Sequence, residues 1–268
     1  MSSRREDAIL FIGDVMGRPG RRLLGEILPG IRRQLGVTAV VANGENSAGG
    51  LGITKKSAEE IFAAGVDVIT SGNHIWDKRE ALQYLEEEPR VLRPSNYPPG
   101  TPGRGFAVFE TDSGREFLMI NVHGRVFIDT AFDCPFRAME EILDIFAGAR
   151  KMPVLVDFHA EATSEKVAMG YALDGRVAAV LGTHTHVQTN DARILPGKTA
   201  YVTDAGMTGP ADGVIGVDSE AIVRRFYSQL PTRFRVASGP RMLNAVLLRL
   251  HPFRPRVKSI ELINERYD

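Results

Sequence analysis

The chain has 268 residues, of which 43% are hydrophobic and 25% are charged, close to the average of globular proteins. Its 33 basic and 33 acidic side chains give a formal net charge of zero. This balance argues against a general binder of extended nucleic acid or of membrane surfaces, because such proteins are normally basic. The single cysteine, Cys134, excludes an internal disulfide and suits a reducing compartment.

The N-terminal apolar run spans only residues 8–12, which is too short for a signal peptide. No stretch approaches the roughly 18 apolar residues that a membrane-spanning helix needs. We therefore expect a cytoplasmic protein with no membrane partner. No linker or internal repeat divides the chain, so we expect a single domain over residues 1–268.

Six short apolar runs, rich in valine and isoleucine, are bounded by glycine, asparagine or aspartate, as buried parallel strands are. They span residues 8–12, 39–42, 66–70, 154–158, 177–181 and 200–203. Helical patterns separate the first of these runs and cover residues 20–35, 54–64 and 77–88. Asp77 and Glu80 form a capping-box pattern at the start of the third helix. This alternation predicts an α/β fold with a parallel core sheet.

The remaining segments interrupt the alternation. Runs 106–110 and 116–121 flank the turn sequence TDSGR and predict a hairpin, and runs 243–250 and 257–263 predict a second antiparallel pair. Added to a parallel core, these strands indicate either one mixed sheet or two packed sheets. Residues 93–105 are expected to form a loop. Residues 124–150 and 160–175 are expected to be helical or irregular, and a small cap within 124–175 could cover a site.

Polar side chains follow five of the predicted strands where each strand ends. They are Asp14, Glu45, Asn46, Asn73, His74, His159, His184 and His186. Ligands bind at the carboxyl ends of strands in open α/β sheets, so we expect these residues to share one sheet edge. Each has an ordinary structural explanation by itself, such as a helix cap or a turn. Their coincidence at successive strand ends indicates a functional site.

The residue types suit a metal centre. Imidazole favours divalent transition metals, whereas carboxylate and amide oxygens favour harder ions. Three histidines, two carboxylates and two asparagines are more ligands than one tetrahedral zinc ion binds. They are about enough for two metal ions that share one carboxylate. Paired metals are typical of enzymes that cleave phosphate esters. His184 and His186 would share a face in an extended chain, but in a turn they could reach different metals.

The order of these motifs resembles that of the calcineurin-like metallophosphoesterases, and in detail that of the YmdB family, over nearly the whole chain. The motifs are IGDVMGRPGR at 12–21, ANGENSAGGLGIT at 42–54, TSGNHIWD at 70–77, VDFHAEATSEK at 156–166, GTHTHVQT at 182–189 and TDAGMTGP at 203–210. The resemblance implies an α/β fold of two packed mixed sheets flanked by helices, a four-layer sandwich. It also implies hydrolysis of cyclic nucleotides, in the first place 2',3'-cyclic nucleotides, with 3',5'-cAMP as a further substrate.

Carried over by position, the resemblance assigns Asp14, Asn46 and His186 to a first metal, Glu45 to a bridging position, and Asn73, His159 and His184 to a second metal. His74 would be the catalytic residue, either as a general acid that protonates the leaving oxygen while a metal-bound hydroxide attacks phosphorus, or as a stabiliser of the transition state. Iron and manganese are the leading candidates for the two metals, with magnesium and zinc as further options.

The chain departs from the commoner pattern of the superfamily at two positions. Many members begin with D-x-H, whose histidine binds the first metal, but here the matching residue is Met16. The bridging residue is Glu45 where aspartate is commoner, and Asn46 could supply the missing ligand. A first site with fewer nitrogen ligands leaves the identity of the metal open.

Weaker signals concern the substrate. Arg18 and His123 are candidates for contact with it, although a structural role for His123 is equally consistent. Arg21 and Arg22 are expected on a solvated helix face. The substrate is expected to be a small phosphate ester or cyclic nucleotide. The sequence leaves open whether the protein forms a homo-oligomer.

Three other functions compete with this prediction. They are a phosphomonoesterase or nuclease using the same metals, a metal-dependent regulator that senses nucleotides without turnover, and a structural metal protein. Zero net charge disfavours the nuclease, since tracking a polyanion needs a basic groove. The candidate acid His74 disfavours the regulator, which needs no acid.

Overall fold

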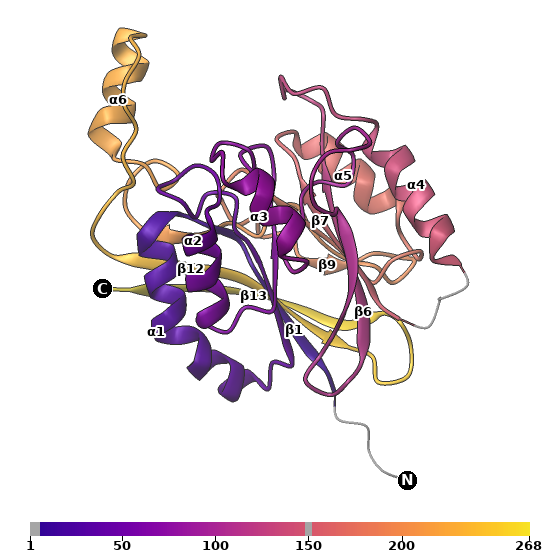
Figure 1. Ribbon diagram of the computed structural model, residues 1–268. Coiled ribbons are helices and arrows are strands. Elements are labelled where there is room, and N and C mark those ends of the chain that lie inside the picture. The colour runs from indigo at the N-terminus through magenta and orange to yellow at the C-terminus, as the bar shows by residue number, and fades with distance from the viewer. Residues whose placement is uncertain (1–5, 148–151) are drawn as a thin grey trace.

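The computed structural model describes residues 6–147 and 152–268, in which two mixed β-sheets lie face to face (Figure 1). The first sheet has the order β2 (Asp14–Val15), β11 (Met207–Pro210), β12 (Arg241–Leu250), β1 (Ala8–Ile12), β3 (Ala39–Asn43) and β4 (Val68–Thr70), with β13 (Val257–Tyr267) also paired to β12. The second has the order β5 (Phe106–Glu110), β6 (Glu116–His123), β7 (Val154–His159), β8 (Ala179–Thr183), β10 (Ala200–Val202) and β9 (Arg193–Ile194).

Of the two arrangements that the sequence left open, two packed sheets are observed, and the six predicted core strands divide equally between them. Strands β1, β3 and β4 run parallel in the first sheet, and β7, β8 and β10 run parallel in the second. A continuous apolar run shows only that both faces of a strand are covered. It does not show whether a helix or another sheet covers them. The two predicted antiparallel pairs are confirmed as β5–β6 and β12–β13.

The strands β1, β3, β4 and β12 of the first sheet alternate between two apolar layers. In β1, Leu10 and Ile12 face the layer of helices α1 (Gly17–Leu35), α2 (Lys55–Ala63) and α3 (Ala81–Glu87). Ile9 and Phe11 face the second sheet. A third apolar cluster lies between the second sheet and helices α4 (Pro135–Ile145) and α5 (Thr163–Ala172). Helices therefore cover the outer face of each sheet.

The helix that was expected over 77–88 begins only at Ala81, and Asp77 does not cap it. The Asp77 carboxylate instead accepts a hydrogen bond from Nδ1 of His74, at 2.9 Å. The cap predicted for the preceding helix is confirmed, because the Thr54 side chain accepts from the backbone N–H of Ser57 and completes a capping box.

Helices α4 and α5 pack in an outer layer, and α6 (Ser219–Ser228) stands away from the two sheets (Figure 1). The predicted cap within 124–175 and the predicted domain over 1–268 include positions among 1–5 and 148–151, outside the described residues. Both stay predictions. Among the described helices, none combines the length and hydropathy needed to cross a bilayer.

Two glycines of α1 provide a matched test of how this helix packs. A β-carbon on Gly20 would lie 2.4 Å from the carbonyl oxygen of Thr208 on β11, whereas one on Gly25 would meet nothing within 4 Å. We expect Gly20→Ala to lower the free energy of unfolding by about 1–3 kcal/mol through overpacking. Gly25→Ala should raise it by about 0.5–1 kcal/mol through helix propensity. Urea denaturation measures both, and equal effects would contradict the packing described.

Candidate metal centre

The candidate site forms where strands of both sheets end. Strand β2 and the segments after β3 and β4 contribute from the first sheet, and β6, β7 and the segment after β8 contribute from the second. The residues gathered there are Asp14, Glu45, Asn46, Asn73, His74, His123, His159, His184 and His186. The expectation that they share one sheet edge is wrong, since two sheets contribute. Their spatial coincidence is nevertheless observed.

One group of ligand-type atoms surrounds Nε2 of His159. This nitrogen lies 3.0 Å from Oε1 of Glu45 and 3.2 Å from Oδ1 of Asn73. The same nitrogen lies 3.0 Å from Nδ1 of His184. Ligand atoms of Glu45, His159 and His184 all lie within 4.8 Å of one another, which is close enough for a single ion to contact all three.

A second group shares Glu45 with the first. Nδ2 of Asn46 lies 3.2 Å from Oε1 of Glu45 and 3.0 Å from Nε2 of His186. The same His186 nitrogen is 3.9 Å from Oδ1 of Asp14. That carboxylate oxygen is buried and has no hydrogen-bond partner among the described residues. A buried carboxylate oxygen without a partner is costly, and a cation would satisfy it.

Three histidines present an unprotonated nitrogen to these groups because their other nitrogen is already bound. Nδ1 of His159 contacts Oγ1 of Thr183 at 2.8 Å, and Nε2 of His184 lies 2.9 Å from a Glu161 oxygen. Nδ1 of His186 donates to the carbonyl oxygen of Ile215 at 2.9 Å. Metal-binding histidines are usually held in this way, with the outer nitrogen donating to a protein oxygen.

The protonation states match the same arrangement. Burial lowers the pKa of His159 and of His184 to about 4, so both rings are neutral near pH 7. Burial opposes ionisation of Glu45 and so raises its pKa, whereas the hydrogen bond from the backbone N–H of His74 acts in the opposite direction. Burial and the negative charge of Glu45 raise the pKa of Asp14 well above its usual value. The neutral histidines turn nitrogen lone pairs toward the cluster, and the buried carboxyls of Asp14 and Glu45 lie close together. A cation bound among them would stabilise both features.

The two histidines of the turn after β8 lie in different groups, His184 beside His159 and His186 beside Asn46. His184 and His186 both adopt left-handed backbone conformations, with φ of 103° and 66°. Such angles are strained for residues other than glycine and cluster at functional sites. Between them, the backbone N–H and the hydroxyl of Thr185 both donate to Oδ2 of Asp204, at 3.1 and 2.9 Å.

His74 lies at the rim of the cluster, with its side chain 32% exposed. Its backbone N–H donates to Oε2 of Glu45 at 3.0 Å, and its Nδ1 donates to Asp77. The ring is therefore oriented by a carboxylate, and its Nε2 is left for a ligand. This combination resembles the positioning of a histidine by aspartate in acid–base catalysis.

The two candidates for substrate contact differ in position. His123 is fully buried, and its Nε2 lies 3.4 Å from Oδ1 of Asn73. Arg18 is exposed in the first turn of α1 and has no described contact with the cluster. The expectation that Arg21 faces solvent is wrong, because its guanidinium donates to the carbonyl oxygen of Ser47 and to Glu60. Arg21 thereby anchors the loop that follows Asn46.

Several supporting residues were not predicted from the sequence although they lie inside the quoted motifs. Asp157 accepts from Thr183 at 2.7 Å and from Asn43 at 3.1 Å, behind the ring of His159. Burial raises the pKa of Asp157 to about 7. Asp204 pairs with Lys166 at 2.6 Å in the interior. A buried strand that contains an acid, such as the VDFH segment, is the signal that could have identified Asp157.

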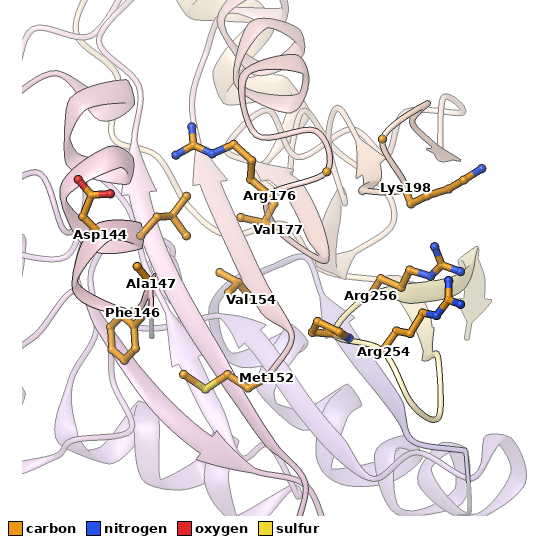
Figure 2. Close-up of a pocket in the computed structure, with 14 residues that line it drawn as sticks. Asp144, Phe146, Ala147, Met152, Val154, Arg176, Val177, Lys198, Arg254 and Arg256 are labelled. Carbon is orange, nitrogen blue, oxygen red and sulfur yellow. The ribbon is translucent and has the colours of Figure 1, made fainter. Parts of the chain in front are cut away.

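A cavity of about 530 Å³ lies elsewhere, at the beginning of β7, the end opposite to His159 (Figure 2). Figure 2 shows Arg254 and Arg256 side by side on one wall, with Val154 between them and the opposite wall that carries Asp144 and Phe146. It contains none of the predicted site residues. The polar cluster at the other end of β7 is therefore the candidate metal centre.

The pair of Lys166 and Asp204 should be energetically coupled, because each charge is buried and neutralised by the other. Lys166→Met or Asp204→Asn alone should lower the free energy of unfolding by about 3–5 kcal/mol, and the double variant by clearly less than the sum. The exposed pair of Lys258 and Glu6 is the control, and Lys258→Met should cost about 0–1 kcal/mol. Urea denaturation of the four variants measures these terms, and strict additivity would contradict the coupling.

Comparison with known proteins gives a consistent result. Residues 10–263 match the model of the YmdB-like protein family. The 2',3'-cyclic-nucleotide 2'-phosphodiesterase of Bacillus subtilis strain 168 is 46% identical over 260 residues, covering 96% of this chain and 97% of that protein.

Solved structures agree with this similarity. A hypothetical protein from Thermus thermophilus has a TM-score of 0.90 at 44% identity, covering 97% of this chain and 100% of the other. A structure from Mycoplasma pneumoniae, described as a novel phosphatase, has a TM-score of 0.91 at 32% identity, covering 99% and 95%. The resemblance drawn from the motifs is thus confirmed, and the chain belongs to the YmdB-like protein family.

Proposed function

We propose that this protein is a two-metal phosphodiesterase that hydrolyses 2',3'-cyclic nucleotides on a calcineurin-like metallophosphoesterase fold. The observation that carries the proposal is the position of Glu45, whose Oε1 lies 3.0 Å from Nε2 of His159 in the first group and accepts a hydrogen bond from Asn46 of the second. The name of the Bacillus subtilis relative supports the choice of substrate. The two face-to-face mixed sheets, with helices on their outer faces, are consistent with the proposed fold.

The proposed ligands follow the two groups of atoms. Asp14, Asn46 and His186 would hold one ion, Asn73, His159 and His184 the other, and Glu45 both. Such ions, with iron or manganese as the leading candidates, supply Lewis acidity and an activated water for attack on phosphorus. The mixture of imidazole, carboxylate and amide donors suits these metals.

The residues of the chain itself position the ions and move the proton. The Asp77 carboxylate accepts a hydrogen bond from Nδ1 of His74, and in the imidazolium form of this ring the Nε2–H would protonate the departing sugar oxygen and leave neutral imidazole. We propose Arg18 as a contact for the substrate phosphate, because it is a cation in the helical turn just after Asp14. The 3.4 Å contact between His123 and Asn73 supports a role for His123 in orienting that amide.

A phosphomonoesterase is the second candidate, because the similar Mycoplasma pneumoniae structure is described as a phosphatase. A panel of 2',3'-cAMP, 3',5'-cAMP, bis-p-nitrophenyl phosphate, 5'-AMP and a short RNA, assayed with Mn²⁺, separates the candidates. The proposal predicts the highest kcat/KM for the 2',3'-cyclic nucleotide. Preference for 5'-AMP or RNA would favour a phosphomonoesterase or a nuclease. Binding without turnover by protein that holds metal would favour a regulator.

Glu45→Ala should remove the carboxylate shared by both groups, so metal content should fall for both ions together. His251→Ala is the control, because that histidine lies before the β12–β13 turn, outside the cluster. Metal analysis of the purified variants measures the effect. Full metal content in Glu45→Ala would contradict the bridging role.

His74→Ala should separate metal binding from turnover. Its side chain is placed by Asp77 and not among the ligand groups, so metal content should stay at the wild-type level. Loss of a general acid should lower kcat by about 10²- to 10⁴-fold. Steady-state kinetics with 2',3'-cAMP, beside metal analysis of the same samples, tests this. Wild-type kcat in metal-loaded His74→Ala would exclude the histidine as the acid.

A further inference from the structure

The β6–α4 loop, residues 124–133, has both of its ends at the candidate metal centre. The buried side-chain amide of Asn96 donates to the carbonyl oxygen of His123 at 2.8 Å and to that of Asp133 at 2.9 Å, and so closes the loop at its base. The ring of Phe132 stacks on that of His123, with 4.2 Å between the ring centroids. Because Nε2 of His123 contacts a proposed ligand, the base of the loop forms part of the wall of the site.

A buried carboxylate fixes the first turn of the β6–α4 loop. Glu165 on α5 accepts hydrogen bonds from the backbone N–H of Arg125, at 3.0 and 3.1 Å, and from that of Val126, at 3.2 Å. The N–H of Gly124 donates to the carbonyl oxygen of His159, a proposed metal ligand, at 2.9 Å. From this anchored base the loop extends beyond the ends of the strands (Figure 1). The fold therefore sets the direction in which the loop leaves the site.

Phe127 lies near the middle of this loop and combines two unfavourable features. It is 84% exposed, so its phenyl ring gains little free energy from burial. Its φ of 64° lies in the left-handed region, where a bulky side chain is strained. Such strain persists only where the surrounding structure imposes it, and it clusters at ligand-binding sites. An anchored loop that presents a strained, exposed aromatic ring beside the metal centre indicates a contact for the substrate.

The position of Phe127 in the chain limits its distance from the site. It follows His123 by four residues, so the two Cα atoms are at most about 14 Å apart. In a 2',3'-cyclic nucleotide the base is attached to C1', the ring carbon next to the one that carries the reacting phosphate. A substrate whose phosphate lies among the proposed ligands therefore extends its base by one sugar ring, a length that the loop can span.

The chemistry of the loop favours a flat ligand over a protein partner. Among residues 124–133, the only other large apolar side chain that is exposed is Val126, at 39%. Protein interfaces use contiguous apolar patches, which a single ring does not provide. One aromatic ring does suffice for a nucleobase, because every base has a π-face that stacks on it.

We propose that Phe127 binds the substrate by stacking on its nucleobase, and that the β6–α4 loop thereby makes the site selective for nucleotides over phosphodiesters without a base. The inference rests on the proposed function, since it places the phosphate at the metal centre. Stacking depends on the π-face and not on the hydrogen-bonding groups of a base. All four bases should therefore be accepted, with purines bound more tightly than pyrimidines because they offer the larger face.

Steady-state kinetics of the metal-loaded enzyme test the stacking. Phe127→Ala should raise KM for 2',3'-cAMP about ten-fold or more. Its kcat should change less than its KM, because the base lies away from the reacting atoms and contributes equally to ground-state and transition-state binding. The ratio of KM for methyl riboside 2',3'-cyclic phosphate, which has no base, to KM for 2',3'-cAMP should fall by the same factor. Phe127→Trp should restore the wild-type ratio, and Phe127→Leu should not.

Phe253→Ala is the matched control. It removes a phenyl ring that is 78% exposed in the turn between β12 and β13, next to Arg254 in the wall of the cavity at the other end of the fold. Both KM values should stay at the wild-type level. An equal effect of Phe253→Ala would show that the loss of any exposed ring has this consequence, and would contradict stacking at Phe127.

A binding titration separates this inference from the proposed function, because it needs no turnover. The fluorescence of Phe127→Trp should be quenched by 3'-AMP and not by ribose 3-phosphate. Phe253→Trp shares Trp76 with that variant and provides the background response. A wild-type protein that hydrolyses no cyclic nucleotide would contradict the proposed function alone. Unchanged KM for 2',3'-cAMP in Phe127→Ala, an equal rise for the base-free diester, or quenching no greater than in Phe253→Trp would overturn the role of Phe127.

Discussion

The buried carboxylate of Glu45 is the constraint on which the site depends. It comes from the first sheet, and the ring it meets at 3.0 Å, His159, comes from the second. A carboxylate at 1% exposure is costly without compensating positive charge or hydrogen bonds. The two sheets must therefore meet so that their carboxyl ends bring imidazoles and amides to Glu45. The apolar layer between the sheets, including Phe11 and Leu155, holds that geometry.

Hydrogen bonds from residues outside the cluster determine which histidine atoms face the metal ligands. Asp157 holds Thr183, which in turn binds Nδ1 of His159, while Asp204 holds the turn that carries His184 and His186. These carboxylates lie in the interior and are themselves hydrogen-bonded, so their positions are well determined. The result is a set of lone pairs that point toward the cluster, and such preorganisation lowers the cost of binding an ion.

Much of this arrangement was predictable from local patterns, and the exceptions have physical reasons. Strand ends identified Asp14 and His159 because chemistry-bearing residues follow apolar runs. The pairing of strands was not predictable, since a run such as 154–158 looks the same whether a helix or a sheet covers it. Asp77 was misassigned as a cap because both a backbone N–H and His74 can donate to a carboxylate. Tyr227 on α6 is 90% exposed, and nothing in the sequence separates this aromatic residue from one on a buried helical face.

The central claim is that Glu45 lies between two metal ions. Anomalous diffraction from a crystal grown with Mn²⁺ tests it most directly, because it locates the ions without reference to activity. The account predicts two peaks, one beside Asp14 and His186 and the other beside His159 and His184, both next to the Glu45 carboxylate. A single peak, or peaks away from Glu45, would contradict it.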